Sequence, residues 1–343
     1  MSTPRMPKQL LRLFLNKSMI QLTIDRLLPM VPKEKIRIVT IEDQMKLFRK
    51  ELDFLGNENY IIEPFAKNTA PCIGLAAVNL LASDPDAIMI ILPADHLIKE
   101  EEAFRKCLQM GVDTVRETDA IVTLGIEPTR PDTGYGYIQY DKAELKNGLH
   151  KVITFAEKPN HSTALRFIET GEFLWNSGIF IWSAKRILNE IEEYLPELFA
   201  SLMEIESVQN LNDPAKRLSR AYSSIKPISI DYGVMERTSK VYVIKGTFDW
   251  SDVGNWEEVY RLSDSDDNGN VVKGQVVALD TKNSYLYSDD GRPLAVVGFS
   301  DIIVVDTAEG TLICPRDKVQ DVGEVAKGVF DALKRKSSGG KSG

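Results

Sequence analysis

Apolar and polar positions follow two different periods along the first 130 residues. Four segments repeat apolar residues at helical spacing, namely 16–30 (NKSMIQLTIDRLLPM), about 43–52, about 69–82 and about 101–116. Between them stand short apolar runs typical of buried strands, namely 36–41 (IRIVTI), the segment YIIEP, 87–92 (AIMIIL) and 120–125 (AIVTLG). This alternation is typical of βαβ units, so it predicts a mostly parallel, doubly wound sheet with helices on its faces.

The pattern changes twice further along the chain. Beyond residue 130 we expect an α+β arrangement. Its strands or turns are expected at YGYIQY, KVITFAEKP and FLWNSGIFIW, and its helices near 184–193 and 212–223. After about Asp264 the helical period disappears, and Asp, Asn and Gly split the short runs VVALD, SYLYS, LAVVGF, DIIVVDT and GTLIC. We therefore predict an α/β domain over 1–264, a small β domain over 265–333 and a flexible tail over 334–343.

Composition and charge narrow the possible functions. A chain of 343 residues has room for about two domains, and no apolar run approaches the ~18 residues of a membrane span. The net charge of -8 and the lack of a Lys/Arg cluster argue against nucleic acid or an anionic membrane as the main partner. Cys72, Cys107 and Cys314 show no CxxC spacing, and no signal peptide precedes them, so we expect a cytoplasmic protein.

Two aspartates are candidate metal ligands. Asp95, in LPADH, follows the apolar strand 87–92, and open α/β sheets bind ligands at the carboxyl ends of their strands. Asp252, in WSDVGNW, becomes a second candidate if folding brings it beside Asp95, because a cation would then relieve the repulsion between the carboxylates. Either residue could instead be an ordinary turn or cap aspartate. The three histidines share no ligand spacing, so a transition-metal site or a histidine triad is not expected.

Three further segments combine polar groups with glycine turns. TRPDTGYGYI joins Arg130 to a Gly-Tyr-Gly turn, which could approach a ligand closely or could simply close a hairpin. FAEKP holds Glu157 and Lys158, which reach one ligand together only if they lie in a loop at the end of a strand. In WNSGIFIW, Asn176 suits hydroxyl recognition but also an Asx-turn.

Seven of these segments, in order, resemble the sugar-nucleotide pyrophosphorylases, and most closely the mannose-1-phosphate guanylyltransferases. They are EPFAKNTAP, LPADH, GIEPTRPDTGYGYI, FAEKP, FLWNSGIFIW, SIDYGVME and WSDVGNW, and the resemblance covers about residues 1–335. It implies a Rossmann-like mixed sheet of the nucleotide-diphospho-sugar transferase type, followed by a small β-helical domain that usually serves in assembly. It also implies a cytoplasmic homodimer.

The resemblance also implies roles for individual residues. Asp95 and Asp252 would hold Mg²⁺, Lys8 would contact the triphosphate, and Lys158 would contact the sugar phosphate. Asn68 and Thr69 would lie near the guanine, with Arg130 and Tyr135 as neighbours of the site. The mannose pocket would be lined by Gly136, Glu157, Asn176 and Asp231.

The activity that this resemblance implies is transfer of GMP from GTP to α-D-mannose 1-phosphate, giving GDP-mannose and pyrophosphate. The attacking phosphate monoester is largely ionised at neutral pH, with a second pKa near ~6, so no general base is required. Two alternatives stay open: a pyrophosphorylase for another base or sugar, and an inactive paralogue or truncated copy that binds sugar nucleotide.

The sequence departs from the resembled family at its start. The glycine-rich loop GGxGxRLxPLS, which wraps the triphosphate, and the strand before it do not occur in this sequence. In a doubly wound sheet that strand lies at the centre, so the strands near 36 and 87 would flank a gap. We therefore expect this chain to be a shortened copy, poorly stable and weakly active until an upstream strand and loop are restored.

Overall fold

The structure is a computed structural model that describes residues 6–146, 148–208, 214–289, 291–308 and 310–323, together with Val325 and Gly328. Residues 1–5 and the expected tail 334–343 lie outside the described residues. No helix among the described residues is both long and apolar enough to cross a membrane.

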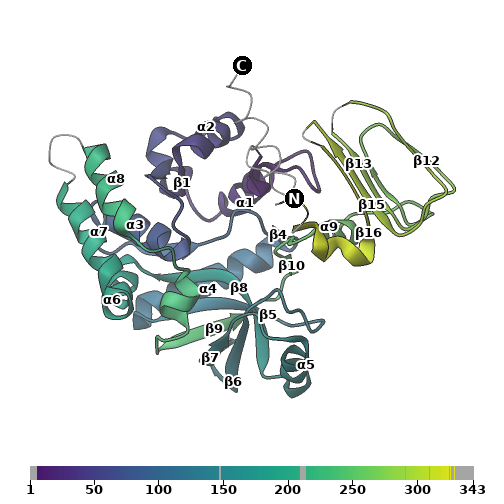
Figure 1. The fold of residues 1–343 in the computed structure, drawn as a ribbon. Coiled ribbons are helices and arrows are strands. Elements are labelled where there is room, and N and C mark those ends of the chain that lie inside the picture. The colour runs from purple at the N-terminus through teal and green to yellow at the C-terminus, as the bar shows by residue number, and fades with distance from the viewer. Residues whose placement is uncertain are drawn as a thin grey trace. The chain divides into compact units, whose positions relative to one another are not determined.

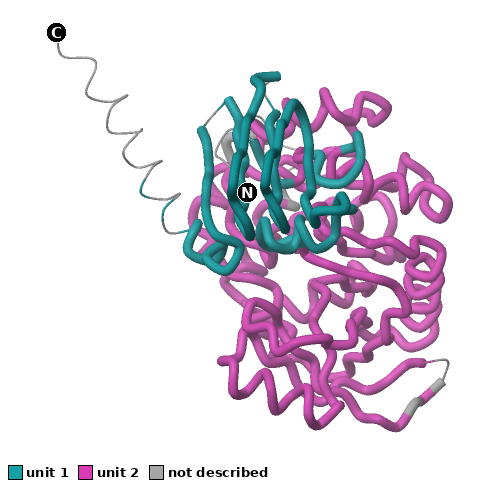
Figure 2. Tube along the Cα trace, turned by 90° about the vertical axis from the view of Figure 1, so that its right-hand side faces the viewer, with its two compact units in different colours: residues 1–8, 12–17, 253–343 teal, residues 9–11, 18–252 magenta. Residues whose placement is uncertain are grey.

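The chain divides into two compact units, which Figure 2 distinguishes by colour. The larger unit comprises residues 9–11 and 18–252, and the smaller comprises 1–8, 12–17 and 253–343. The sequence places the domain boundary at 264/265, whereas helix α9 (Trp256–Leu262) groups with the smaller unit. The reason is local: Glu257 in α9 pairs with Arg316 at 2.5 Å, and Trp256 packs against Tyr285.

Most of the expected helices and strands of the larger unit are present (Figure 1). Its helices are α1 (Met19–Leu27), α2 (Glu42–Glu51), α3 (Thr69–Leu81), α4 (Glu101–Thr118), α5 (His161–Thr170), α6 (Ala184–Tyr194), α7 (Pro196–Val208) and α8 (Pro214–Ser224). Its strands are β1 (Ile38–Ile41), β2 (Tyr60–Glu63), β3 (Ile88–Ile91), β4 (Leu97–Ile98), β5 (Ile121–Ile126), β6 (Tyr137–Lys146), β7 (Leu149–Ala156), β8 (Phe173–Ser183), β9 (Val241–Lys245) and β10 (Trp250–Ser251).

The main sheet has six strands in the order β3-β8-β5-β9-β7-β6 and is mixed. Strand β8 lies antiparallel between β3 and β5, and only β5 and β9 pair in parallel, so the expectation of a mostly parallel sheet is wrong. Both faces are covered. On β8, Phe180 and Trp182 pack with α3, α6, α7 and α8, while Ile179 and Ile181 pack with α4 on the other face. This doubly wound arrangement confirms the predicted fold class.

A second, two-stranded sheet pairs β1 with β2 in parallel, as the βαβ pattern predicts. Helices α1 and α2 pack on it around a small core that includes Ile24, Phe48 and Leu52. Within the described part of the chain, β1 pairs only with β2 and β3 pairs only with β8. Each of these strands therefore has one edge without a partner strand among the described residues, and the expected gap between them stays a prediction.

The smaller unit is rich in short strands, as predicted. A four-stranded sheet has the order β11-β13-β15-β16 and a two-stranded sheet joins β12 to β14, with parallel pairing except between β15 and β16. The strands are β11 (Val271–Lys273), β12 (Val276–Leu279), β13 (Tyr285–Ser288), β14 (Leu294–Val297), β15 (Ile302–Thr307) and β16 (Gly310–Pro315). Successive parallel strands in two sheets are the arrangement of a β-helix.

Candidate active site

The two candidate metal ligands are brought close together by the short ladder between β4 and β10. Leu97 pairs with Ser251 in antiparallel register. Asp95 lies two residues before β4 and Asp252 directly follows β10, so both lie at the same end of this ladder. The side-chain amide of Gln9 donates to Asp95 Oδ2 over 3.4 Å, and the hydroxyl of Tyr135 donates to Asp252 Oδ1 over 3.0 Å.

As metal ligands, the carboxylates of Asp95 and Asp252 fit Mg²⁺. Mg²⁺ is usually held by one or two carboxylates together with substrate phosphates, rather than by a cage made entirely of protein groups. No cluster of three or more His, Cys, Asp or Glu side chains able to hold a metal occurs among the described residues. A pair of aspartates at the edge of the sheet, completed by phosphate oxygens, is the arrangement that such a site requires.

The residues expected to line a sugar pocket form a connected group. The backbone N–H of Asn176 donates to the carbonyl of Gly136 over 2.8 Å, and its side-chain amide donates to Asp231 Oδ1 over 2.9 Å. An alanine Cβ at Gly136 would lie 2.5 Å from Glu157 Oε2, so the absence of a side chain there lets the Glu157 carboxylate approach. All four predicted residues therefore meet.

Asn176 lies within strand β8, and its side-chain oxygen accepts from the Gly178 backbone N–H over 3.0 Å, as in the Asx-turn that the sequence leaves open. It stands opposite Gly125, where the pairing between β5 and β8 shifts register. Such a bulge re-aims a side chain, and bulges are frequent beside active sites. Here the side-chain amide reaches Asp231, in a short π-helical turn (Asp231–Met235).

Glu157 and Lys158 lie in a loop at the end of a strand, which is the condition under which both can reach one ligand. Strand β7 ends at Ala156, so both residues lie in the loop beyond it, and Lys158 Nζ is 2.7 Å from Glu157 Oε1. Lys158 has φ 44°, a left-handed conformation that costs most residues energy and often marks functional sites. Its hydrogen bond to Glu157 raises the pKa of Lys158, which therefore stays cationic.

Burial raises the pKa of Asp231, while the hydrogen bond from Asn176 opposes this effect. The charge of Glu157 also raises the pKa of Asp231, and Lys158 lowers it. The group thus combines two carboxylates, an amide and an ammonium. Such groups suit a ligand that carries several hydroxyls and a phosphate.

Asn68 and Thr69 lie at the N-terminus of α3. Asn68 is the N-cap, and its side-chain oxygen accepts from the Thr69 backbone N–H over 2.8 Å. Thr69 Oγ1 accepts from the Ile230 backbone N–H over 2.8 Å. The segment expected near the base is therefore tied to the residue preceding Asp231.

Arg130 and Tyr135, expected as neighbours of the site, lie near Asp252, since the Tyr135 hydroxyl donates to Asp252 and Arg130 lies over the Tyr135 ring. The Arg130 guanidinium is 2.8 Å from Asp132 and 5.7 Å from the centre of the Tyr135 ring. The Tyr135 ring packs edge to face on Trp175 and Trp250. Lys8 belongs to the smaller unit, at the start of a 3-10 turn (Lys8–Leu10), and its contact with the triphosphate stays a prediction.

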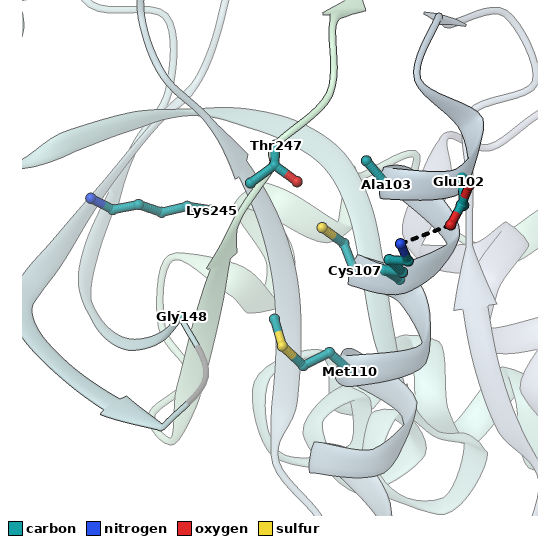
Figure 3. Close-up of a pocket in the computed structure, with 8 residues that line it drawn as sticks. Glu102, Ala103, Cys107, Met110, Gly148, Lys245 and Thr247 are labelled. Atoms are coloured by element: carbon teal, nitrogen blue, oxygen red, sulfur yellow. Dashed lines mark ion pairs between the residues drawn. The ribbon is translucent and has the colours of Figure 1, made fainter.

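A pocket of about 670 Å³ lies elsewhere in the larger unit, between α4 and the end of β9 (Figure 3). None of the predicted site residues lines it. Lys106 pairs with Glu102 at 2.8 Å, and the Lys245 side chain leads away from Cys107 and Met110 to lie over the Tyr140 ring. Since both cations have partners, this pocket does not offer the features of a phosphate site.

Comparison with known proteins decides the family. A model of the nucleotidyl transferase family matches residues 2–269. The chain belongs to this family. A model of the MannoseP isomerase/GMP-like beta-helix domain matches residues 274–328, so this nucleotidyl transferase also carries the expected β-helical domain.

Named relatives agree with this assignment. The chain is 35% identical to mannose-1-phosphate guanylyltransferase of Escherichia coli, over 95% of this chain and 72% of that protein. It is 34% identical to the alginate biosynthesis protein AlgA of Pseudomonas aeruginosa, over 95% of this chain and 68% of that protein. The crystal structure of mannose-1-phosphate geranyltransferase from Thermus thermophilus superposes with a TM-score of 0.85 at 32% identity, covering 96% of this chain and 94% of that one.

Proposed function

We propose that this nucleotidyl transferase transfers GMP from GTP to α-D-mannose 1-phosphate, giving GDP-mannose and pyrophosphate. The observation that carries the proposal is the linked group Gly136, Glu157, Asn176 and Asp231, with Lys158 beside it, in a chain related to a mannose-1-phosphate guanylyltransferase. The carboxylates and the amide suit sugar hydroxyls, and the ammonium suits a sugar phosphate.

The reaction is an in-line displacement at the α-phosphorus of GTP. An oxygen of the mannose 1-phosphate forms the new P–O bond, and the bond to pyrophosphate breaks. Since that oxygen is already ionised, the protein contributes by orientation and by charge neutralisation. Lys158 holds the sugar phosphate in line, Glu157, Asn176 and Asp231 fix the sugar ring, and Lys8 contacts the triphosphate.

Asp95 and Asp252 would hold Mg²⁺, which neutralises phosphate charge when it is bound. Asn68 and Thr69 lie on the guanine side of the site in this proposal. The hydrogen bond that the Ile230 backbone N–H donates to Thr69 Oγ1 supports this placement, because it links the segment expected near the base to the segment that carries Asp231.

The test is a product assay with four nucleotides. The protein is incubated with Mg²⁺, α-D-mannose 1-phosphate and GTP, UTP, dTTP or ATP in turn, and products are identified by mass spectrometry. The chain is assayed as it stands and with an upstream strand and glycine-rich loop added, because its sequence lacks that loop. GDP-mannose should be the main product, and a preference for UDP- or dTDP-mannose would refute the assignment of the base.

The metal ligands are tested by Asp95→Ala and Asp252→Ala. Each variant should lose orders of magnitude in rate, because phosphate charge is then no longer neutralised. Near-normal turnover in either variant would remove that aspartate from the site.

Self-association through the smaller unit is also part of this proposal. Four apolar side chains are more than half exposed on β12, on β14 and two residues after β14: Val277, Leu279, Val297 and Phe299. Leu279 is paired with Val297, and alternate residues of a strand share a face, so these side chains form one apolar surface. A second copy of the same surface is the partner that we propose, in a homodimer.

Light scattering after gel filtration tests the dimer. Leu279→Lys combined with Val297→Lys should convert dimer to monomer, whereas Ile313→Lys, at an exposed apolar position in the other sheet, should not. A dimer that survives the double change would refute this interface. A cytoplasmic location completes the proposal, supported by the three cysteines, which are free.

A further inference from the structure

His96 directly follows Asp95 in the sequence and makes two different kinds of contact. Its backbone carbonyl accepts from both terminal nitrogens of Arg26, each over 3.3 Å. Its ring nitrogen Nδ1 accepts the indole N–H of Trp250 over 3.1 Å, because an indole nitrogen can only donate. His96 is thus held from α1 through its main chain and from β10 through its side chain.

The arginine contact is unusual in its burial. Arg26 is only 2% exposed, and burial lowers its pKa to about 10, although the nearby charge of Glu101 raises it. A buried guanidinium that donates two hydrogen bonds to one carbonyl holds that carbonyl in place. If the carbonyl moved, two buried N–H groups would lose their acceptor, which costs free energy. The main chain directly after Asp95 is therefore anchored to α1.

The contacts of Trp250 connect His96 to the second candidate ligand, Asp252. Trp250 precedes Asp252 by two residues, and its ring packs edge to face on His96 and on Tyr135, with centroids 5.3 Å apart in both cases. Tyr135 donates to Asp252. One indole thus contacts both the residue next to Asp95 and the residue that holds Asp252.

The backbone ladder alone holds these acids weakly. Strands β4 and β10 have two residues each, and two carboxylates close together repel one another when no cation lies between them. Side-chain contacts across the ladder are therefore needed to keep the acids at a fixed separation.

We propose that His96 and Trp250 are positioning residues that set the separation of the Asp95 and Asp252 carboxylates, and so the affinity of the site for its divalent cation. This inference rests on the proposed function, since it takes these aspartates as the metal ligands. His96 takes no part in proton transfer here. It links two loops.

The test measures Mn²⁺ binding without turnover. Mn²⁺ is titrated into the protein saturated with GDP-mannose, with no pyrophosphate present, and free Mn²⁺ is followed by electron paramagnetic resonance. Trp250→Phe keeps an aromatic ring on Tyr135 but removes the N–H donor, and His96→Phe removes the acceptor. Each should raise the Mn²⁺ dissociation constant about fivefold, the effect of one lost hydrogen bond.

Two controls separate positioning from general damage. Trp182→Phe makes the same chemical change at a buried indole whose N–H has no partner among the described residues, so Mn²⁺ binding should not change. His96→Asn places an acceptor near the Nδ1 position and should restore most of the affinity. In steady-state assays the Mg²⁺ requirement of Trp250→Phe should rise while the KM for mannose 1-phosphate stays constant.

The outcomes distinguish this inference from the proposed function. Wild-type Mn²⁺ affinity in Trp250→Phe and His96→Phe, with weakened binding in Asp95→Asn, would overturn the positioning role alone. An equal loss in Trp182→Phe would also overturn it. Unchanged Mn²⁺ binding in both Asp95→Asn and Asp252→Asn would instead refute the metal site itself.

Discussion

The side-chain amide of Asn176 donates to Oδ1 of Asp231 over 2.9 Å, joining strand β8 to a π-helical turn 55 residues away in sequence. This bond supports the charged form of a carboxylate whose pKa burial raises. It therefore keeps Asp231 able to accept hydrogen bonds from a ligand at lower pH than burial alone would allow.

Asn176→Ala should weaken sugar binding and change the pH profile. Without the donor, the pKa of Asp231 rises further, so the carboxylate becomes protonated at higher pH and the acidic limb of kcat/KM moves upward. The KM for mannose 1-phosphate should rise about tenfold, since a buried polar group loses its partner. Asn160→Ala, which removes the N-cap of α5 and a hydrogen bond from the Ser162 hydroxyl, should leave KM unchanged. An unshifted acidic limb in Asn176→Ala would contradict the prediction.

Tyr135→Phe should affect the metal requirement rather than the fold. The ring contacts with Trp175 and Trp250 remain, while the donor to Asp252 is lost. We expect the Mg²⁺ concentration for half-maximal rate to rise about fivefold. Tyr140→Phe, whose hydroxyl bonds the Gly171 carbonyl, is the matched control. Equal Mg²⁺ dependence in the two variants would show that the hydroxyl of Tyr135 does not support the metal site.

Gly136→Ala should reduce activity through Glu157. The new Cβ would lie 2.5 Å from Glu157 Oε2, so the carboxylate must move away from its position beside Lys158. We expect kcat/KM for mannose 1-phosphate to fall about tenfold to a hundredfold while the melting temperature stays close to that of the wild type. Gly323→Ala, where a Cβ meets open space, serves as the control. Wild-type kcat/KM would mean that Glu157 does not contact the sugar.

The sequence predicts elements well where the chain is buried in a regular way. Strand β5 is buried at every position, and its apolar run predicts it directly. Helix α3 begins at the cap that Asn68 supplies. By contrast, helices α5 and α7 have no clear signal of their own in the chain pattern, and the antiparallel insertion of β8 depends on pairing between segments that lie far apart in the sequence.

The candidate site also contains residues that local motifs indicate and residues that only the folded structure brings together. Residues in ordered motifs, such as Asp95 and Glu157, can be proposed from the sequence, but the side chains around them depend on long-range contacts. Arg26 lies on the apolar face of its helix, seven residues after Met19, and a charge at such a position was the available signal for a buried role. Nothing local to Trp250 or His96 indicates that they meet, because they are 154 positions apart along the chain.

A buried hydrogen-bonded pair, Tyr222 and Glu63, gives a prediction about stability. Tyr222 in α8 donates its hydroxyl to Glu63 at the end of β2, and both residues are buried. Burial raises the pKa of Glu63, and the Tyr222 hydroxyl opposes that effect. Burial and the Glu63 charge also raise the pKa of the nearby Cys72 thiol to about 12.

Tyr222→Phe should destabilise the protein more at neutral pH than in mild acid. An acid whose folded-state pKa is raised favours the folded state below its ordinary pKa, and this contribution is lost as pH rises through the folded pKa. Removing the Tyr222 donor raises the pKa of Glu63 further, so the loss grows. Urea unfolding should show a deficit of about 1–3 kcal/mol at about pH 7.5 and a smaller deficit at about pH 5. In a Glu63→Gln background the same substitution should cost an equal amount at both pH values, because no carboxylate remains to titrate. A deficit that is independent of pH in the Glu63 protein would show that this carboxylate does not depend on Tyr222.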